Sequence, residues 1–135
     1  MIKLTLPLPP SSNHSYVVCK GRRGKGLVKT QAARDFQSEV RHIIFKHGFN
    51  YATSSPIRLT FTVHFPNNLR RDVSNVEKML FDALQCSRVN RSIIKDGIYI
   101  DDRQIIDHRG IRGENAEEAY VEVEIEILEE GIAYV

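Results

Sequence analysis

The sequence NNLRRDVSNVEKMLFDAL, residues 67–84, begins as a turn and continues as an amphipathic helix. Its apolar residues recur every three or four positions, which predicts one buried face: Val73, Val76, Leu80 and Leu84. Its polar residues share another face at spacings of three, three and four: Asp72, Asn75, Lys78 and Asp82. The segment therefore predicts a helix that presents carboxylates beside an ammonium group, directly after two arginines, Arg70 and Arg71.

A second acidic position, Asp101–Asp102, follows the apolar run Ile98–Tyr99–Ile100. Carboxylate oxygens are the ligands that Mg²⁺ favours, and a bound metal ion can activate water for attack on a phosphodiester. The two acidic positions and Lys78 therefore predict a divalent-metal site for phosphodiester chemistry.

Each of these residues also has an ordinary structural explanation. Asp72 is well placed to cap a helix, and Ser74–Glu77 fits the capping-box pattern. Lys78 could be a solvated helix lysine, and Asp101–Asp102 could form a turn. The structural explanation weakens when the residues are taken together, because basic segments flank them on both sides.

The composition is that of one globular domain spanning residues 1–135, with residues 131–135 expected to be a frayed tail. Hydrophobic residues make up 41% of the chain and charged residues 27%, which is ordinary for a soluble protein. No apolar run approaches the roughly 20 residues of a membrane helix. Cys19 and Cys86 lie far apart, which argues against a disulfide framework or zinc site and indicates the cytoplasm.

The net charge of +2 hides an asymmetry along the chain. All 19 Lys and Arg residues lie at or before Arg112, together with nine of the 17 acidic residues, which leaves this part at +10. The remaining residues, 113–135, carry eight glutamates and no Lys or Arg. A basic body of this kind favours a polyanionic partner, although a solvated mixed surface would explain the charge equally well.

Apolar alternation predicts strands at Ile2–Leu8, Ile57–Phe65 and Val121–Ile127, the last with its glutamates facing water. Thr30 is predicted to cap a helix that runs to about His47. Without repeats or linkers, this order predicts a single α+β domain. We expect a small mixed or antiparallel sheet with two main helices packed on one face.

Weaker signals lie between these elements. Tyr16–Cys19 and Ile98–Ile100 are predicted to be short strands, and Ile105–His108 a further one, followed by a loop over residues 109–118. Lys20–Gly26 is basic but lacks the Gly-Lys-Ser/Thr of a P-loop, so it is either a phosphate-contacting loop or a solvated hairpin tip. The segment after Leu84 is predicted to be another basic connection.

Three ordered motifs resemble the RusA-type Holliday junction resolvases and span most of the chain. Leu6–Asn13 resembles the family's Leu-Pro-x-Pro-Pro-Ser-x-Asn opening. Arg71–Lys78, followed by Phe81–Leu84, resembles its Arg-Asp-x-Asp-Asn-x-x-Lys…Asp-Ala-Leu signature. Asp101–Ile105 resembles its Asp-Asp-x-Gln-Val. The resemblance implies a RusA-like fold and a homodimer that cuts two opposed strands of a four-way DNA junction.

The resemblance also implies Mg²⁺ bound by carboxylates, with Mn²⁺ as a possible substitute, and a lysine that assists catalysis. Three residues match the catalytic positions: Asp72, Lys78 and Asp102. Ser74 departs from the pattern because it stands where the family carries an aspartate, and the segment before Asp101 is longer than usual. The lost carboxylate should weaken metal binding, although Asp101, Glu77 or Asp82 could offset it.

The sequence thus predicts a metal-dependent, structure-specific endonuclease that resolves four-way junctions in recombination and repair by paired nicks. The expected metal ligands are Asp72, Asp102, Asp101 and Ser74. The expected DNA contacts are Arg22, Arg23, Lys25, Arg70, Arg71 and Asn75. Two alternatives are a junction-binding protein with little or no cleavage, which Ser74 favours, and a generic α+β interaction domain.

Overall fold

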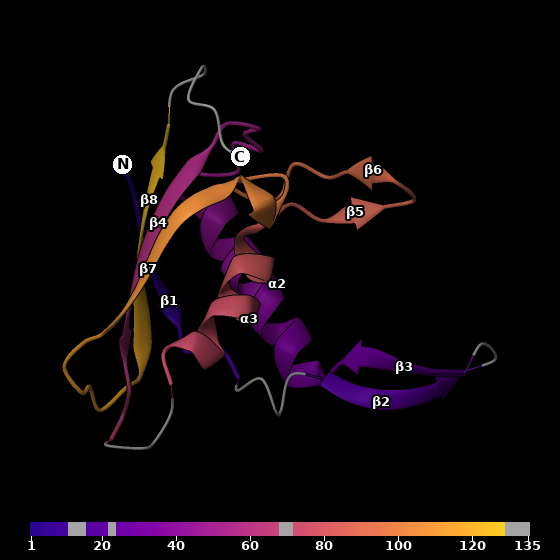
Figure 1. The fold of residues 1–135 in the computed structure, drawn as a ribbon, viewed down its shortest axis with the longest axis horizontal. Helices are drawn as coiled ribbons and strands as arrows, with labels where there is room; N and C mark the ends of the chain where they lie inside the picture. The colour runs from indigo at the N-terminus through magenta and orange to yellow at the C-terminus, as the bar shows by residue number, and fades with distance from the viewer. Residues whose placement is uncertain (11–15, 22–23, 68–71, 129–135) are drawn as a thin grey trace.

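The computed structural model describes residues 1–10, 16–21, 24–67 and 72–128, with side chains except in residues 16–28 (Figure 1). The predicted frayed tail, residues 131–135, lies outside this part of the chain.

Four strands form one mixed sheet, in the order β1-β8-β4-β7. They are β1 (Ile2–Pro7), β8 (Tyr120–Ile127), β4 (Ile57–His64) and β7 (Ile105–Arg112). β8 pairs antiparallel with both β1 and β4, whereas β4 pairs parallel with β7. The sequence prediction of a small mixed sheet is confirmed.

Two helices, α2 (Gln31–Lys46) and α3 (Ser74–Leu84), cover one face of this sheet, as predicted (Figure 1). Thr30 caps α2, its hydroxyl oxygen accepting a hydrogen bond from the Ala33 N–H at 3.2 Å. The buried faces of both helices join the alternate apolar residues of the strands in one core. Neither described helix is long and apolar enough to cross a membrane.

The opposite face of the sheet carries charged side chains that remain exposed to water. Arg58 on β4 pairs across strands with Asp107 on β7 at 3.0 Å and with Glu126 on β8 at 3.1 Å. Glu122 and Glu124 on β8 are exposed, as the alternation predicted. The functional groups that the sequence singles out therefore have to be sought on the helical side.

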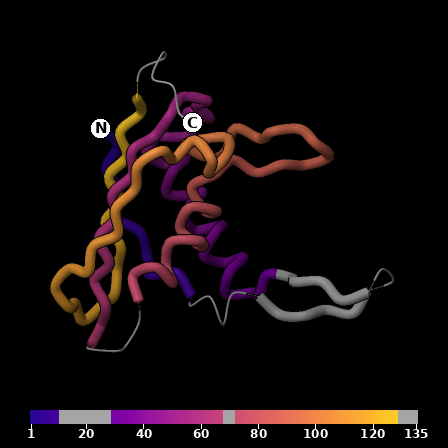
Figure 2. The backbone as a smooth tube through the Cα atoms, in the orientation of Figure 1, coloured from indigo at the N-terminus to yellow at the C-terminus, as the bar shows by residue number. Residues whose placement is uncertain are grey.

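Two hairpins lie outside the sheet. β2 (Tyr16–Gly21) pairs with β3 (Gly24–Lys29), and β5 (Arg88–Val89) pairs with β6 (Ser92–Ile93). Of the two alternatives left open for Lys20–Gly26, the hairpin is the one that the structure supports, because these residues join the paired ends of β2 and β3. The predicted basic connection after Leu84 contains a hairpin of its own, which extends away from the sheet beyond the end of α3 (Figures 1 and 2).

Two weaker predictions about the last third of the chain were wrong. β7 continues to Arg112, through residues predicted to be a loop, because its backbone pairs in parallel with β4. The sequence does not predict this strand, since most of its side chains are exposed and show no apolar alternation. Ile98–Ile100 is no regular strand. Tyr99 forms only isolated bridges to Thr53 and Gln85, since the segment passes between two loops rather than beside a strand.

Candidate active site

The first predicted acidic position lies at the start of α3. Asp72 is exposed directly before the helix, and its backbone carbonyl accepts a hydrogen bond from the Asn75 N–H at 3.0 Å. The N-cap residue is Val73, and no side chain caps the helix. The suggestion that Asp72 or Ser74 serves as a cap is therefore wrong: residue 73 already has helical dihedral angles, so the turn closes through the backbone.

A glycine brings this end of α3 close to the sheet. A Cβ atom on Gly110 of β7 would lie 2.7 Å from Val73 Cγ1 and 2.7 Å from Phe61 Cζ. Contacts this short do not occur between real side chains, so only glycine lets Val73 pack here. The packing of Val73 in turn fixes where its neighbours Asp72 and Ser74 emerge.

The polar face of α3 is as predicted. Asn75 and Lys78 are exposed, three residues apart, and the half-buried Asp82 follows after four more. Next to this face, His108 Nδ1 of β7 lies 2.8 Å from Glu77 Oε1, and its ring meets Phe81 edge-on at 5.5 Å. The sequence assigned no role to this His108–Glu77 pair, because only the fold brings β7 beside α3.

The second acidic position lies against the last turn of α3. Gln85 Oε1 accepts a hydrogen bond from the Asp102 backbone N–H at 2.9 Å. The fully buried Tyr99 ties the same region to the helix, its hydroxyl donating to the Phe81 carbonyl at 2.6 Å. Asp102 is therefore held beside the end of α3 from which Asp82 emerges.

A short 3₁₀-helix, η1 (Asp102–Gln104), orients the two adjacent aspartates. Asp101 caps it by accepting from the Arg103 N–H at 2.9 Å, and Gln104 Oε1 accepts from the Asp101 N–H at 2.9 Å. The buried Gln104 also donates to the carbonyls of Thr53 and Ser55, at 2.8 and 2.9 Å. Asp101-x-x-Gln104 carries the sequence signal of this capping box, although only a turn was predicted there.

The two aspartates have different acidities. The Arg103 backbone N–H and then the Arg103 guanidinium lower the pKa of the Asp101 carboxyl. Burial raises the pKa of the Asp102 carboxyl, and its hydrogen bond to Asp101 and the charges of Asp101 and Asp82 raise it further. A cation at Asp102 would relieve the repulsion among these carboxylates.

The two acidic positions lie toward opposite ends of α3. The eight residue steps from Ser74 to Asp82 span about 12 Å of helix, and Asp72 precedes them. Mg²⁺ binds oxygens at about 2.1 Å, so one ion cannot contact both Asp72 and Asp82. Within the described part of the chain, no three His, Cys, Asp or Glu side chains gather closely enough to form a metal cage.

Most of the predicted DNA contacts are not among the residues that the structure describes. Arg22, Arg23, Arg70 and Arg71 lie outside the described residues, and only the backbone of Lys25, in β3, is described. Asn75 lies on the face of α3 that carries Lys78.

Comparison with known proteins matches this chain to one family. The sequence model of the family described as endodeoxyribonuclease RusA matches residues 7–126. The chain is 30% identical over 109 residues to the crossover junction endodeoxyribonuclease RusA of Escherichia coli strain K12, covering 81% of this chain and 80% of that protein. The protein of the same name from Enterobacteria phage 82 is 29% identical over the same shares. The chain belongs to the RusA endodeoxyribonuclease family.

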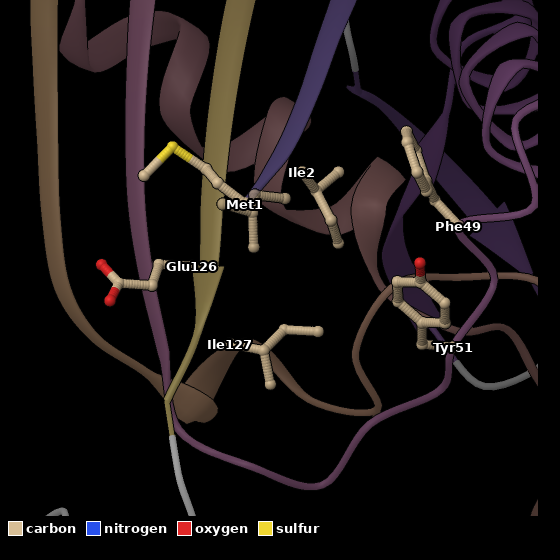
Figure 3. A pocket seen from close by; sticks show the side chains of 7 residues that line it. Met1, Ile2, Phe49, Tyr51, Glu126 and Ile127 are labelled. Carbon is tan, nitrogen blue, oxygen red and sulfur yellow. The ribbon is translucent and has the colours of Figure 1, made fainter.

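The RusA match includes both acidic positions, the whole of α3 and the segment between them. A shallow pocket of about 250 Å³ lies elsewhere, at the β1–β8 side of the sheet (Figure 3). Met1, Ile2, Phe49, Tyr51 and Ile127 make its lining largely apolar. Its acidic residue, Glu126, pairs with Arg58, so the RusA chemistry is to be sought at α3 and η1.

Proposed function

We propose that this RusA-family chain is a Mg²⁺-dependent endonuclease that resolves four-way DNA junctions in recombination and repair. The observation that carries the proposal is the position of Asp102, held by Gln85 against the last turn of α3, where the charges of Asp101 and Asp82 act on its carboxyl group. The names of its relatives, crossover junction endodeoxyribonucleases, supply the substrate class. We propose that the protein acts on DNA in the cytoplasm.

The residues fit Mg²⁺ as a partly hydrated ion. This metal usually keeps several waters and takes one or two protein carboxylates together with substrate phosphates, so a cage of three side chains is not required. Asp102 and Asp82 are the pair that would hold one ion, with Asp101 beside them. The other predicted ligands, Asp72 and Ser74, lie at the opposite end of α3 and would hold a separate ion. Bound there, Mg²⁺ or Mn²⁺ would polarise the scissile phosphate and lower the pKa of a water molecule.

The other side chains would act on the DNA itself. The Lys78 ammonium, on the exposed face of α3, would stabilise negative charge that develops on the phosphate or leaving oxygen. Asn75, one turn earlier, would orient the phosphate. Arg22, Arg23, Lys25, Arg70 and Arg71 would hold the backbones of the junction arms, contacts that position a substrate without reading its sequence.

Paired nicks require two active sites, so we propose that the working unit is a homodimer whose two-fold axis matches that of the junction.

The proposal is tested with a labelled four-way junction and a linear duplex of the same sequence, each incubated with protein and Mg²⁺, Mn²⁺ or EDTA. We expect metal-dependent nicks in the junction alone, and their loss in Asp102→Asn. Asp35→Asn, an exposed carboxylate change on α2, is the matched control and should cut normally. Nicks that persist in EDTA, or no nicks with either metal, would overturn the proposal.

A junction-binding protein with little cleavage is the second candidate, and Ser74 is the observation that favours it. It is distinguished by a band shift on the junction without cut product under either metal. A binding affinity for the junction that does not change with salt concentration would instead support the generic interaction domain, because phosphate contacts weaken as the salt concentration rises.

A further inference from the structure

The β5–β6 hairpin has no role in the function proposed above. It lies between α3 and Asp101. Arg88 pairs with Ile93 and Val89 with Ser92, so that Asn90 and Arg91 form a two-residue turn. The hairpin extends away from the sheet beyond the end of α3 (Figure 2).

The base of the hairpin is firmly anchored. Asp96 closes it by accepting from the Ser87 N–H at 2.7 Å and from the Ser87 hydroxyl at 2.5 Å, and it lies 3.5 Å from the Arg41 guanidinium of α2. Gly97 sits so close to the chain that a Cβ atom would lie 2.4 Å from the Cys86 nitrogen. These contacts hold the base of the hairpin against α2.

Its surface combines apolar and cationic side chains. Val89 is 55% exposed, and Ile93 and Ile94 are each 43% exposed. Residues 88–95 include three basic side chains, Arg88, Arg91 and Lys95, and no acidic one. Ile93 pairs with Arg88 on one face of the two-stranded ribbon and Val89 pairs with Ser92 on the other, so exposed aliphatic groups lie on both faces. Their flanking cations favour a polyanionic partner whose apolar surface can contact the ribbon from either side.

The turn adds an independent observation. Asn90 and Arg91 have φ values of +49° and +67°, the region that type I′ turns require and that Asn-Gly satisfies best. Arginine at the second position is strained because of its Cβ atom. Within the described residues Arg91 forms no ion pair that would offset the strain. A strained residue without such a partner points to a role in binding.

The position of the hairpin relates it to the cleavage site. Arg88 Nη2 lies 3.5 Å from Asp101 Oδ2, so the root of the hairpin touches the acidic turn. The tip, three residues further on, reaches about 10 Å beyond, since a strand rises about 3.3 Å per residue. That distance corresponds to about three nucleotide steps of 3.4 Å along a strand.

We propose that β5–β6 probes the branch point of the DNA junction, an inference that rests on the nuclease function proposed above. Val89, Ile93 and Ile94 contact base pairs opened at the strand exchange, as apolar wedges do in other DNA-binding proteins. Arg88, Arg91 and Lys95 hold the phosphates beside them. In the open form of a junction, base pairs at the branch point lack a stacked neighbour on one side, so apolar side chains reach them at lower cost than inside a duplex.

Two variants test separately what the apolar and the cationic side chains of the hairpin contribute to junction binding. Val89→Ser with Ile93→Ser removes apolar groups that are already exposed. Arg91→Gly removes a charge and relieves the turn, so it should leave thermal stability unchanged or higher. The controls are Phe45→Ser, an exposed apolar group on α2, and Lys3→Ala, an exposed cation on β1.

Binding is measured without metal, on a four-way junction and a linear duplex of the same sequence. 2-Aminopurine is placed at the branch point or within an arm. We expect the parent protein to brighten only the branch-point probe. The double variant should abolish this signal and lower the preference for the junction about tenfold, which corresponds to 1.4 kcal/mol. Arg91→Gly should weaken junction binding while keeping part of the signal, and both controls should match the parent.

The outcomes distinguish the two proposals. If the parent prefers and cuts junctions but the hairpin variants equal it, the branch-point role is wrong and the nuclease function stands. If the parent neither prefers nor cuts junctions, the nuclease function itself fails. If the variants change the mass of the protein in solution and lose junction binding in the same proportion, the hairpin is a contact between copies, which also overturns the branch-point role.

Discussion

Ser74 follows Asp72 by two residues at the exposed start of α3, where the resemblance to the RusA family implies a second aspartate. A serine hydroxyl can be a metal ligand but brings no charge to balance the cation. We expect Ser74→Asp to lower the Mg²⁺ concentration for half-maximal junction cleavage by about tenfold, whereas Ser74→Asn should not. The measurement is cleavage rate against Mg²⁺ concentration. If Ser74→Asp both cleaves more slowly and needs a higher Mg²⁺ concentration for half-maximal cleavage, our account of this position is wrong.

Asp72 itself is exposed and does not cap α3, so its carboxylate is not needed to start the helix. We expect Asp72→Asn to retain tight junction binding and to lose cleavage by about a hundredfold or more. Band shifts in EDTA and single-turnover cleavage in Mg²⁺ separate the two effects, with Asp35→Asn as control. Unchanged cleavage would leave Asp102 and Asp82 as the only carboxylates required.

Cys86 lies at the root of the β5–β6 hairpin and is 3% exposed. Burial raises the pKa of its thiol above the usual 9.0. A raised pKa leaves less thiolate at every pH, and the thiolate is the reactive form. In a Cys19→Ser background, we expect iodoacetamide to alkylate the folded chain more slowly than the urea-unfolded chain from pH 7 to 9. Equal rates would mean that the hairpin root opens readily.

At the scale of the elements, α3 packs closely against β7 only because residue 110 is a glycine. We expect Gly110→Ala to lower the free energy of unfolding by about 1–3 kcal/mol, because the new methyl group overlaps Phe61 and Val73. It should also reduce cleavage, since Val73 positions Asp72. Urea unfolding and junction cleavage test both effects. The matched control is Gly48→Asn, at an open helix end with φ +70°, which asparagine tolerates.

Elements with a strong local signal were predictable from the sequence. β1, β4 and β8 alternate cleanly because one face of each is buried, and Thr30 marks the start of α2 by its cap. β7 was not predictable, since an edge strand whose side chains are mostly exposed has no apolar period. The β5–β6 hairpin lacked the Asn-Gly signal, because Arg91 occupies the glycine position of its turn.

The candidate site also has a part that the sequence predicted and a part that only the structure revealed. The polar face of α3 and the Asp101–Asp102 pair followed from spacing and from the motifs. The contacts that hold Asp102 did not, because Gln85 lies 17 residues from it and Gln104 bonds to carbonyls some 50 residues away. That Asp82, rather than Asp72, is the α3 carboxylate near Asp102 required the fold, since only the path of the chain after α3 decides which end of the helix η1 meets.

At the scale of the whole molecule, each chain offers one candidate active site, whereas the proposed resolution of a junction needs two cuts. We expect a solution mass of twice the 15.5 kDa chain and paired cleavage that linearises a supercoiled plasmid with an extruded cruciform. When parent and Asp102→Asn chains are mixed and refolded together, the mixed dimers should nick one strand and yield open circles. Inactive chains in excess should therefore convert linear product into nicked product, because each site belongs to one chain. Linear product that falls without any rise in open circles would show that the two sites act only together.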